Sequence, residues 1–260
     1  MKTRSLLAKL AKKYPKSIAK KYHDFAGLQV GKIRENTKTI FLCLDFDYET
    51  FNYLKNNDLI SKIDLVITHH PFIYGTFAKV INNDEIKKSL VEDVLKNNLT
   101  IYSYHTNFDE GKDGMNDALA EKLGLLSIAS MPSNSMGRGG ELAKEMDVKE
   151  FANYARKALN VDYSFLINCG KERIKRVAIV GGGGWYIYKD AIKDGYDLFI
   201  SGDIPHHGRR DVISYKYNYL DMPHEIESIF VDQMEKVLKE IDPSFVIYKI
   251  KHEKLPILIQ

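Results

Sequence analysis

Cysteine is scarce in this chain. Only two of its 260 residues are cysteines, Cys43 and Cys169, and both lie within apolar, strand-like runs. Nothing in their spacing demands a disulfide. We therefore expect two small buried side chains in a reducing compartment, which favours the cytoplasm.

Long apolar runs and a strong net charge are also missing. No apolar run reaches the ~20 residues that span a bilayer, and the N-terminal MKTRSLLAKLAKKYPKS has no secretory apolar core. We therefore expect a cytoplasmic protein with no membrane partner. Because the net charge is only +3, with acids and bases mixed, it gives no electrostatic case for a nucleic acid partner. A locally basic surface would not show in such totals.

Strand-like and helix-like runs alternate along most of the chain. Apolar strand patterns at 38–46, 64–69 and 100–106 are each followed by a helical pattern, which predicts a mostly parallel sheet covered by helices. The segment 127–141 is rich in Ser, Gly, Pro and Asn and is the predicted boundary. The rhythm then repeats. We predict two α/β domains, residues 1–128 and 129–260, with mixed sheets and a metal site in the crevice between the two halves.

Two adjacent histidines follow the second strand pattern. In VITHHP, Pro71 cannot continue a central strand, so His69 and His70 leave the pleat and need not point to opposite faces. Ligands of open α/β sheets bind beyond the carboxyl ends of strands. Both imidazoles can therefore converge on one site, although two hydrogen-bonded loop histidines are the plainer interpretation.

The third strand pattern ends in a similar way. His105 and Asp109 are four residues apart in HTNFDEG, and a neighbouring strand end would bring them close to the histidine pair. The alternative for Asp109 is a cap on the helix that follows, but Asp113 and Asn116 suit that cap better. His105 is the candidate catalytic residue, as a proton shuttle or an orienting group, with a structural strand-end role as the alternative.

A third cluster opens a predicted helix after Pro223. His224 and Glu227 are three apart and share a helix face, whereas Glu225 lies about 100° round. Imidazole and carboxylate suit zinc, iron or manganese. Five such ligands exceed one tetrahedral zinc and fit two divalent metal ions with a bridging water better. The predicted ligands are His69, His70, Asp109, His224 and Glu227.

The same residues carry a family resemblance. GLQVG (27–31), THHP (68–71), HTNFD (105–109), GRGGEL (137–142), VGGGG (180–184), SGDIPHH (201–207) and the His/Glu turn at 224–227 resemble the Nif-three-like family of GTP cyclohydrolase type-two homologues. The resemblance implies a dinuclear metal centre in an α/β fold and a ring-shaped homohexamer. The family usually places its Glu four residues after the His, where this chain has Ser228, so helix geometry selects Glu227.

These patterns together indicate a metal-dependent hydrolase acting on a small-molecule or nucleotide substrate. The resemblance alone suggests opening of the purine ring of GTP through a metal-bridging hydroxide. The alternatives are a phosphoesterase and a non-catalytic, metal-binding ring with a regulatory or interaction role. Two further motifs stay open: His206 and His207 are substrate contacts or structural, and GGGGWY is an anion cradle or a tight turn.

Overall fold

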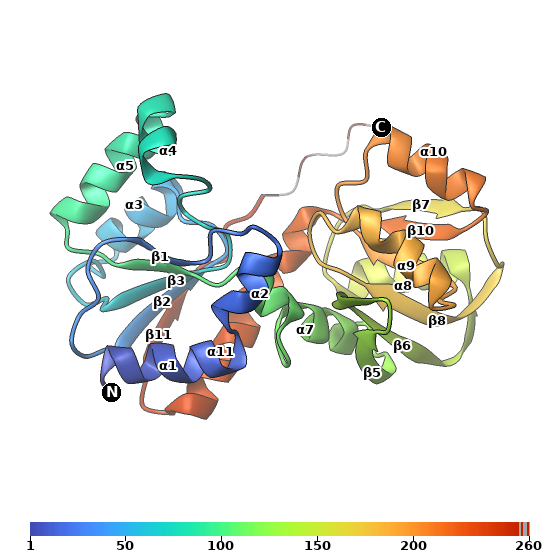
Figure 1. Cartoon of the computed structure of the whole chain (residues 1–260), viewed down its shortest axis with the longest axis horizontal. Coiled ribbons are helices and arrows are strands. Elements are labelled where there is room, and N and C mark those ends of the chain that lie inside the picture. Colours follow the sequence, from blue (N-terminus) through green and yellow to red (C-terminus); the bar gives the residue numbers. More distant parts are fainter. Residues whose placement is uncertain (255, 257–258, 260) are drawn as a thin grey trace. The chain divides into compact units, whose positions relative to one another are not determined.

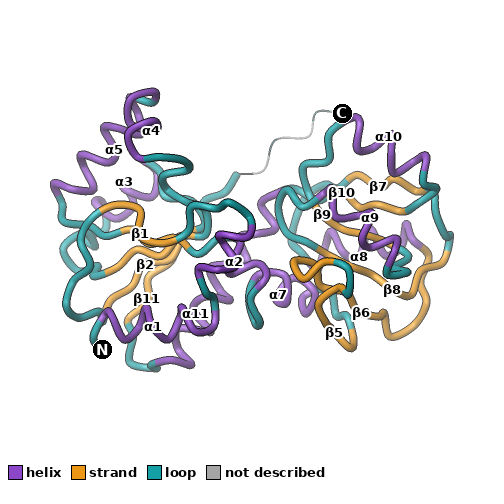
Figure 2. The backbone as a smooth tube through the Cα atoms, in the orientation of Figure 1, coloured by secondary structure: helices purple, strands orange, loops and turns teal. Residues whose placement is uncertain are grey.

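The computed structural model describes residues 1–254, 256 and 259. The chain forms two compact units, one built from Met1–Lys112 with Phe230–Glu253 and the other mainly from Asp113–Ile229. Each unit contains its own sheet with helices packed on it (Figures 1 and 2). The predicted mixed α/β class is therefore confirmed.

The sheet of the first unit is largely parallel. Its five strands lie in the order β1-β4-β3-β2-β11, and only β1, on one edge, runs antiparallel to its neighbour. Strands buried on both faces are expected to be continuous apolar runs, and LVIT of β3 is buried throughout. The strands are β1 (Gly27–Val30), β2 (Thr39–Cys43), β3 (Leu65–Thr68), β4 (Ile101–Ser103) and β11 (Val246–Lys249).

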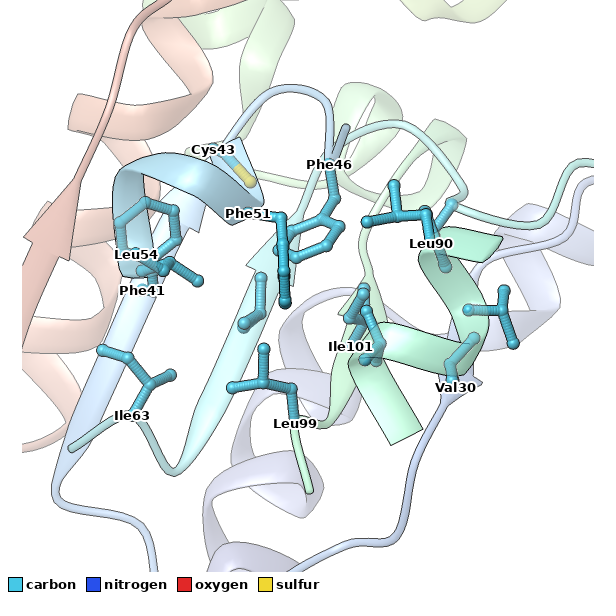
Figure 3. Close-up of a cluster of buried hydrophobic side chains, with 14 of the residues drawn as sticks. Val30, Phe41, Cys43, Phe46, Phe51, Leu54, Ile63, Leu90, Leu99 and Ile101 are labelled. Atoms are coloured by element: carbon cyan, nitrogen blue, oxygen red, sulfur yellow. The ribbon is translucent and has the colours of Figure 1, made fainter. Parts of the chain in front are cut away.

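Helices cover both faces of this sheet. On one face, Phe51 and Leu54 of α3 and Leu90 of α5 pack with Phe41 and Cys43 in a buried apolar cluster (Figure 3). α1 and α11 lie against the other face (Figure 1). The helices of this unit are α1 (Thr3–Lys13), α2 (Lys16–Lys21), α3 (Tyr48–Asn56), α4 (Phe77–Asn83), α5 (Glu85–Lys96), α6 (Thr106–Glu110) and α11 (Ile229–Ile241).

The sheet of the second unit is mixed. Its six strands lie in the order β5-β6-β8-β9-β10-β7, with a parallel centre of β8, β9 and β10. The strands are β5 (Leu126–Met131), β6 (Asn134–Asp147), β7 (Phe165–Asn168), β8 (Arg173–Ile179), β9 (Leu198–Ser201) and β10 (Asn218–Asp221). The helical segments are α7 (Met115–Lys122), α8 (Val148–Ala158), η1 (Trp185–Ile187), α9 (Tyr188–Lys193), α10 (His206–Ser214) and η2 (His224–Ser228).

The segment 127–141 is not a linker between domains. It forms most of the antiparallel β5–β6 hairpin, so the boundary predicted there is wrong. Its glycines allow close packing within the sheet: a Cβ on Gly139 would lie 2.0 Å from the hydroxyl oxygen of Tyr196. The glycine content therefore reflects crowding around a strand and not a flexible connection.

The two units also differ from the predicted division into residues 1–128 and 129–260. α11 and β11 belong to the first unit, where β11 pairs in parallel with β2. The chain thus returns to its first sheet after completing the second. Sequence order alone cannot show which sheet a last strand joins.

Two simpler expectations can be compared with the structure. Cys43 is buried as expected, but Cys169 is exposed, because it follows the antiparallel edge strand β7 and does not lie in a core strand. None of the described helices combines the length and the apolar character that crossing a bilayer requires.

Candidate metal centre

Three adjacent parallel strands of the first unit end in an imidazole or a carboxylate. Asp45 follows β2, His69 and His70 follow β3, and His105 follows β4. Carboxyl ends of parallel neighbours meet at one edge of a sheet, so these side chains converge. The ring of His69 lies 5.0 Å from that of His70 and 5.0 Å from that of His105, measured between centroids. One ring nitrogen from each of the three histidines lies within 4.8 Å of the others.

The first two imidazoles are held through Nδ1. His69 donates from Nδ1 to the carbonyl oxygen of Tyr104 at 2.9 Å, and His70 donates from Nδ1 to the carboxylate of Asp45 at 2.9 Å. Because a carbonyl or an ionised carboxylate only accepts, Nδ1 carries a proton, and in the neutral imidazole Nε2 then carries the lone pair. Metal-binding histidines in proteins almost always show this arrangement.

Asp109 supplies a carboxylate to the same cluster. It lies on α6, and its Oδ1 is 3.5 Å from Nε2 of His69, which is fully buried. The ring of His69 also lies 5.1 Å from that of Phe230, which gives the cluster an apolar wall. Two ligands that each bind one cation at ~2.0–2.2 Å lie about 3 Å apart, so this His/Asp pair fits a shared cation.

His105 is held by a second carboxylate. Its Nδ1 donates to Asp24 at 2.9 Å, and Asp24 also accepts hydrogen bonds from the amide and hydroxyl of Thr106. Burial alone would raise the pKa of Asp24, but the hydrogen bond and charge of His105 and the bonds from Thr106 lower it to about 2. Asp24 is thus an anion at all ordinary pH values and can stabilise a positive charge on the imidazole.

The second unit contains a matching arrangement at the ends of β9 and β10. His224 donates from Nδ1 to the carboxylate of Asp203, which follows β9, at 2.5 Å. Nε2 of His224 lies 3.0 Å from Oε2 of Glu227. Both residues lie on η2, a 3₁₀ helix, where side chains three apart are eclipsed. Glu227 is 4% exposed, whereas Glu225 is half-buried.

A glycine turn after β8 makes room for Glu227. Gly182 has φ +58°, and a Cβ there would lie 2.4 Å from Oε1 of Glu227 and 3.0 Å from Nε2 of His224. The amide of Gly181 donates to the side chain of Asn116 at 2.7 Å, which fastens the turn to α7. The GGGGWY motif is therefore a tight turn. Because its glycines have no Cβ, the buried carboxylate of Glu227 has room beside it. The sequence suggested that Asn116 caps α7, but its side chain instead holds this turn.

Charges around His224 favour its protonated form. Burial alone would lower the pKa of His224, but the hydrogen bonds and negative charges of Glu227 and Asp203 outweigh it and raise that pKa to about 9. A metal cation that replaced the proton on Nε2 of His224 would also balance the negative charges of Glu227 and Asp203. Binding of a metal here would therefore release a proton.

The predicted residues thus fall into two groups. We call His69, His70, His105 and Asp109 the first cluster and His224 with Glu227 the second cluster; the first lies in the first unit and the second in the second unit. His206 and His207 belong to neither, since they lie exposed at the start of α10 with their ring centroids 5.6 Å apart.

Sequence reasoning missed the orienting carboxylates. Asp45 and Asp203 each follow a strand by two residues, which was a usable signal, while Asp24 precedes β1 and carried none. His252 lies in a charged stretch of the sequence, yet its side chain is only 8% exposed and its Nε2 lies 3.0 Å from Asp47.

Known proteins resemble the chain along nearly its whole length. A GTP cyclohydrolase 1 type 2 homolog of Clostridium perfringens is 33% identical over 241 residues, covering 90% of each chain. A protein of the same name from Streptococcus pneumoniae is 29% identical, covering 84% of this chain and 83% of its own. The crystal structure of a Bacillus cereus protein related to NIF3 superposes with a TM-score of 0.88 at 20% identity, covering 100% and 99% of the two chains.

The sequence similarity covers nearly the whole chain, and the fold matches that of the Bacillus cereus protein. The sequence profile of Duf34/NIF3 (NGG1p interacting factor 3) matches residues 1–256, and the chain belongs to this family.

Proposed function

We propose that the chain is a metal-dependent hydrolase that binds two divalent cations, zinc, iron or manganese. The proposed ligands are His69, His70 and Asp109 of the first cluster and His224 and Glu227 of the second cluster. The observation that carries this proposal is the engagement of Nδ1 in every one of its imidazoles, by a carbonyl oxygen at His69 and by carboxylates at His70 and His224. An acceptor at Nδ1 leaves Nε2 of each imidazole as the nitrogen that a cation can bind once that nitrogen has no proton.

The donor set fits such cations. It contains only imidazole nitrogen and carboxylate oxygen, which suits zinc, iron and manganese, and the buried Glu227 and His69 place two of these donors away from water. When bound, cations of this kind act as Lewis acids and lower the pKa of a coordinated water.

The remaining residues position groups and move protons. Asp45 and Asp203 orient His70 and His224 through Nδ1. His105 is the proton-transfer group: its Nε2 takes or gives the proton while Asp24, hydrogen-bonded to Nδ1, stabilises the imidazolium. This is the role that a buried aspartate plays behind a general-base histidine.

The substrate of this proposal is a nucleotide, with ring opening of GTP as the leading reaction. It rests on the names of the curated relatives, which are called GTP cyclohydrolase 1 type 2 homologs. A homohexamer is part of the same proposal and is tested by light scattering of the purified chain.

The test combines metal analysis with turnover. Full-length protein is purified without chelator, its metal is counted by elemental analysis, and it is assayed with GTP and with a generic phosphodiester. We expect two ions per chain and turnover of GTP that falls at least 100-fold in His105→Gln, which can retain metal, and in Asp109→Asn, which should lose it. Fewer than half an ion per chain would contradict the metal centre. Full metal loading without turnover of any substrate would favour the non-catalytic binding role.

A further inference from the structure

The motif GLQVG at 27–31 is not explained by the metal centre. Gln29 lies on the edge strand β1, and its side-chain amide donates to the carbonyl oxygens of Phe25 at 2.7 Å and Gly27 at 3.2 Å. Its Oε1 accepts from the amide of Ile73 at 3.0 Å. One side chain thus fastens the segment before β1 to the segment after β3, and both lie in the first unit.

These two fastened segments each expose an aromatic ring. Phe25 is 39% exposed and Tyr74 is 66% exposed, and their ring centroids lie 5.3 Å apart at an interplanar angle of 68°. A T-shaped pair of this kind is a favourable aromatic contact. Exposing two large rings forfeits the stabilisation that their burial would give, so a braced and exposed pair suggests a ligand.

The aromatic pair is connected to the first cluster through neighbouring residues of the chain. Phe25 follows Asp24, whose carboxylate accepts from Nδ1 of His105, so the Cα of Phe25 lies roughly 12 Å or less from the Nε2 of that imidazole. Tyr74 comes four residues after His70, which limits their Cα separation to about 14 Å. These limits allow one ligand to place one part at the imidazoles and a flat part on the rings.

We propose that Phe25 and Tyr74 form a stacking subsite for a planar heteroaromatic ring, such as a nucleobase, of the molecule that the first cluster processes. This inference rests on the proposed function and names its substrate class. The first cluster suits a polar or anionic group, whereas the exposed rings suit a flat, uncharged one. Stacking tolerates every base, since each has a π-face, so this subsite selects for a ring and not for one particular base.

Two probes separate the ring from the phosphate. Guanosine has a ring and no phosphate, and ribose 5-phosphate has a phosphate and no ring. We expect Phe25→Ala and Tyr74→Ala each to weaken guanosine binding by about tenfold or more in calorimetric titrations of the full chain, with ribose 5-phosphate unchanged. Phe25→Tyr and Tyr74→Phe should keep guanosine affinity within about threefold, because the ring faces remain.

An exposed aromatic residue elsewhere provides the matched control. Phe165 on β7 is 52% exposed, and Phe165→Ala should leave guanosine binding unchanged. Unchanged guanosine affinity in both alanine variants would overturn the proposal, as would wild-type protein that does not bind guanosine. Altered oligomeric mass in those variants, with guanosine affinity intact, would assign the rings to contact between copies and also overturn it.

Metal content distinguishes this inference from the proposed function. Guanosine binding that depends on Phe25 in a protein without metal would keep the stacking subsite and reject the metal-dependent hydrolase. Two ions per chain, with guanosine binding that is unchanged in the Phe25 and Tyr74 variants, would keep the metal centre and reject the stacking subsite.

Discussion

The carboxylate of Asp45 accepts the Nδ1 hydrogen of His70, with both of its oxygens within 2.9 and 3.0 Å of that nitrogen. The loop after β2 therefore sets the ring orientation of a residue at the end of β3. Because the proton is held on Nδ1, Nε2 of His70 is the nitrogen that can bind a cation. The ends of two neighbouring strands of one sheet thus contribute to the first cluster together, one with the imidazole and the other with the carboxylate that orients it.

Removing the charge of Asp45 should weaken metal binding. We expect Asp45→Asn to lower metal affinity by about 10–100-fold, because the imidazole loses its orienting charge and part of its basicity. Competition titration against a chromophoric chelator measures this change. Asp47→Asn is the matched control: Asp47 caps α3 through the amide of Thr50, and asparagine caps nearly as well. An equal loss of affinity in both variants would refute a specific role for Asp45.

The two glutamates of η2 should differ sharply. Glu227 is buried and lies 3.0 Å from Nε2 of His224, whereas Glu225 is half-buried. We expect Glu227→Gln to reduce the metal content by about one ion per chain, since an amide is a much weaker ligand than a carboxylate. Glu225→Gln should retain the wild-type content in the same elemental analysis. The reverse result would identify Glu225 as the ligand.

Adjacent glycines of the turn after β8 offer another matched pair. Gly182 has φ +58°, and its added Cβ would meet Glu227 at 2.4 Å, so Gly182→Ala should lower the free energy of unfolding by about 1–3 kcal/mol and weaken metal binding. In Gly183→Ala the nearest atom to the new Cβ is an oxygen of Asp203 at 3.4 Å, an ordinary contact. Urea unfolding and metal titration should therefore leave Gly183→Ala near wild type. Similar losses in the two variants would contradict the role given to Gly182.

Asp221 should make stability depend on pH. Burial, together with the charge of Asp203, raises the pKa of Asp221 from 3.8 to about 6. Between about pH 4 and pH 6 the folded chain therefore binds more protons at this residue than the unfolded chain, and its contribution to stability falls as pH rises.

The variant Asp221→Asn isolates this contribution. It should be more stable than wild type above pH 6, and the difference should shrink as pH falls towards 4, since protonated Asp221 is also neutral. Urea unfolding at several pH values from 4 to 7.5 measures the two curves. A difference that stays constant with pH would show that Asp221 does not titrate in this range.

The positions of the candidate ligands could be read from local patterns. THHP and HTNFD follow apolar runs, and parallel neighbouring strands must present their carboxyl ends at one edge, so convergence of His69, His70 and His105 followed from strand order in the simplest α/β arrangement. His224 and Glu227 share a helix face as predicted, even though the segment is a 3₁₀ helix, because residues three apart share a face in both helix types.

The sequence by itself determined the apolar runs, the helix periods and the chemistry at their ends, since these depend only on neighbouring residues. Tertiary structure alone decided that the glycine-rich segment 127–141 is a hairpin, that β11 joins the first sheet, and that Asp24 and Asp45 hold His105 and His70. Apart from the hairpin, those pairings join residues 25 to more than 200 positions apart. Their free energy comes from contacts that exist only once the sheets have formed, so no local pattern identifies which residues will pair.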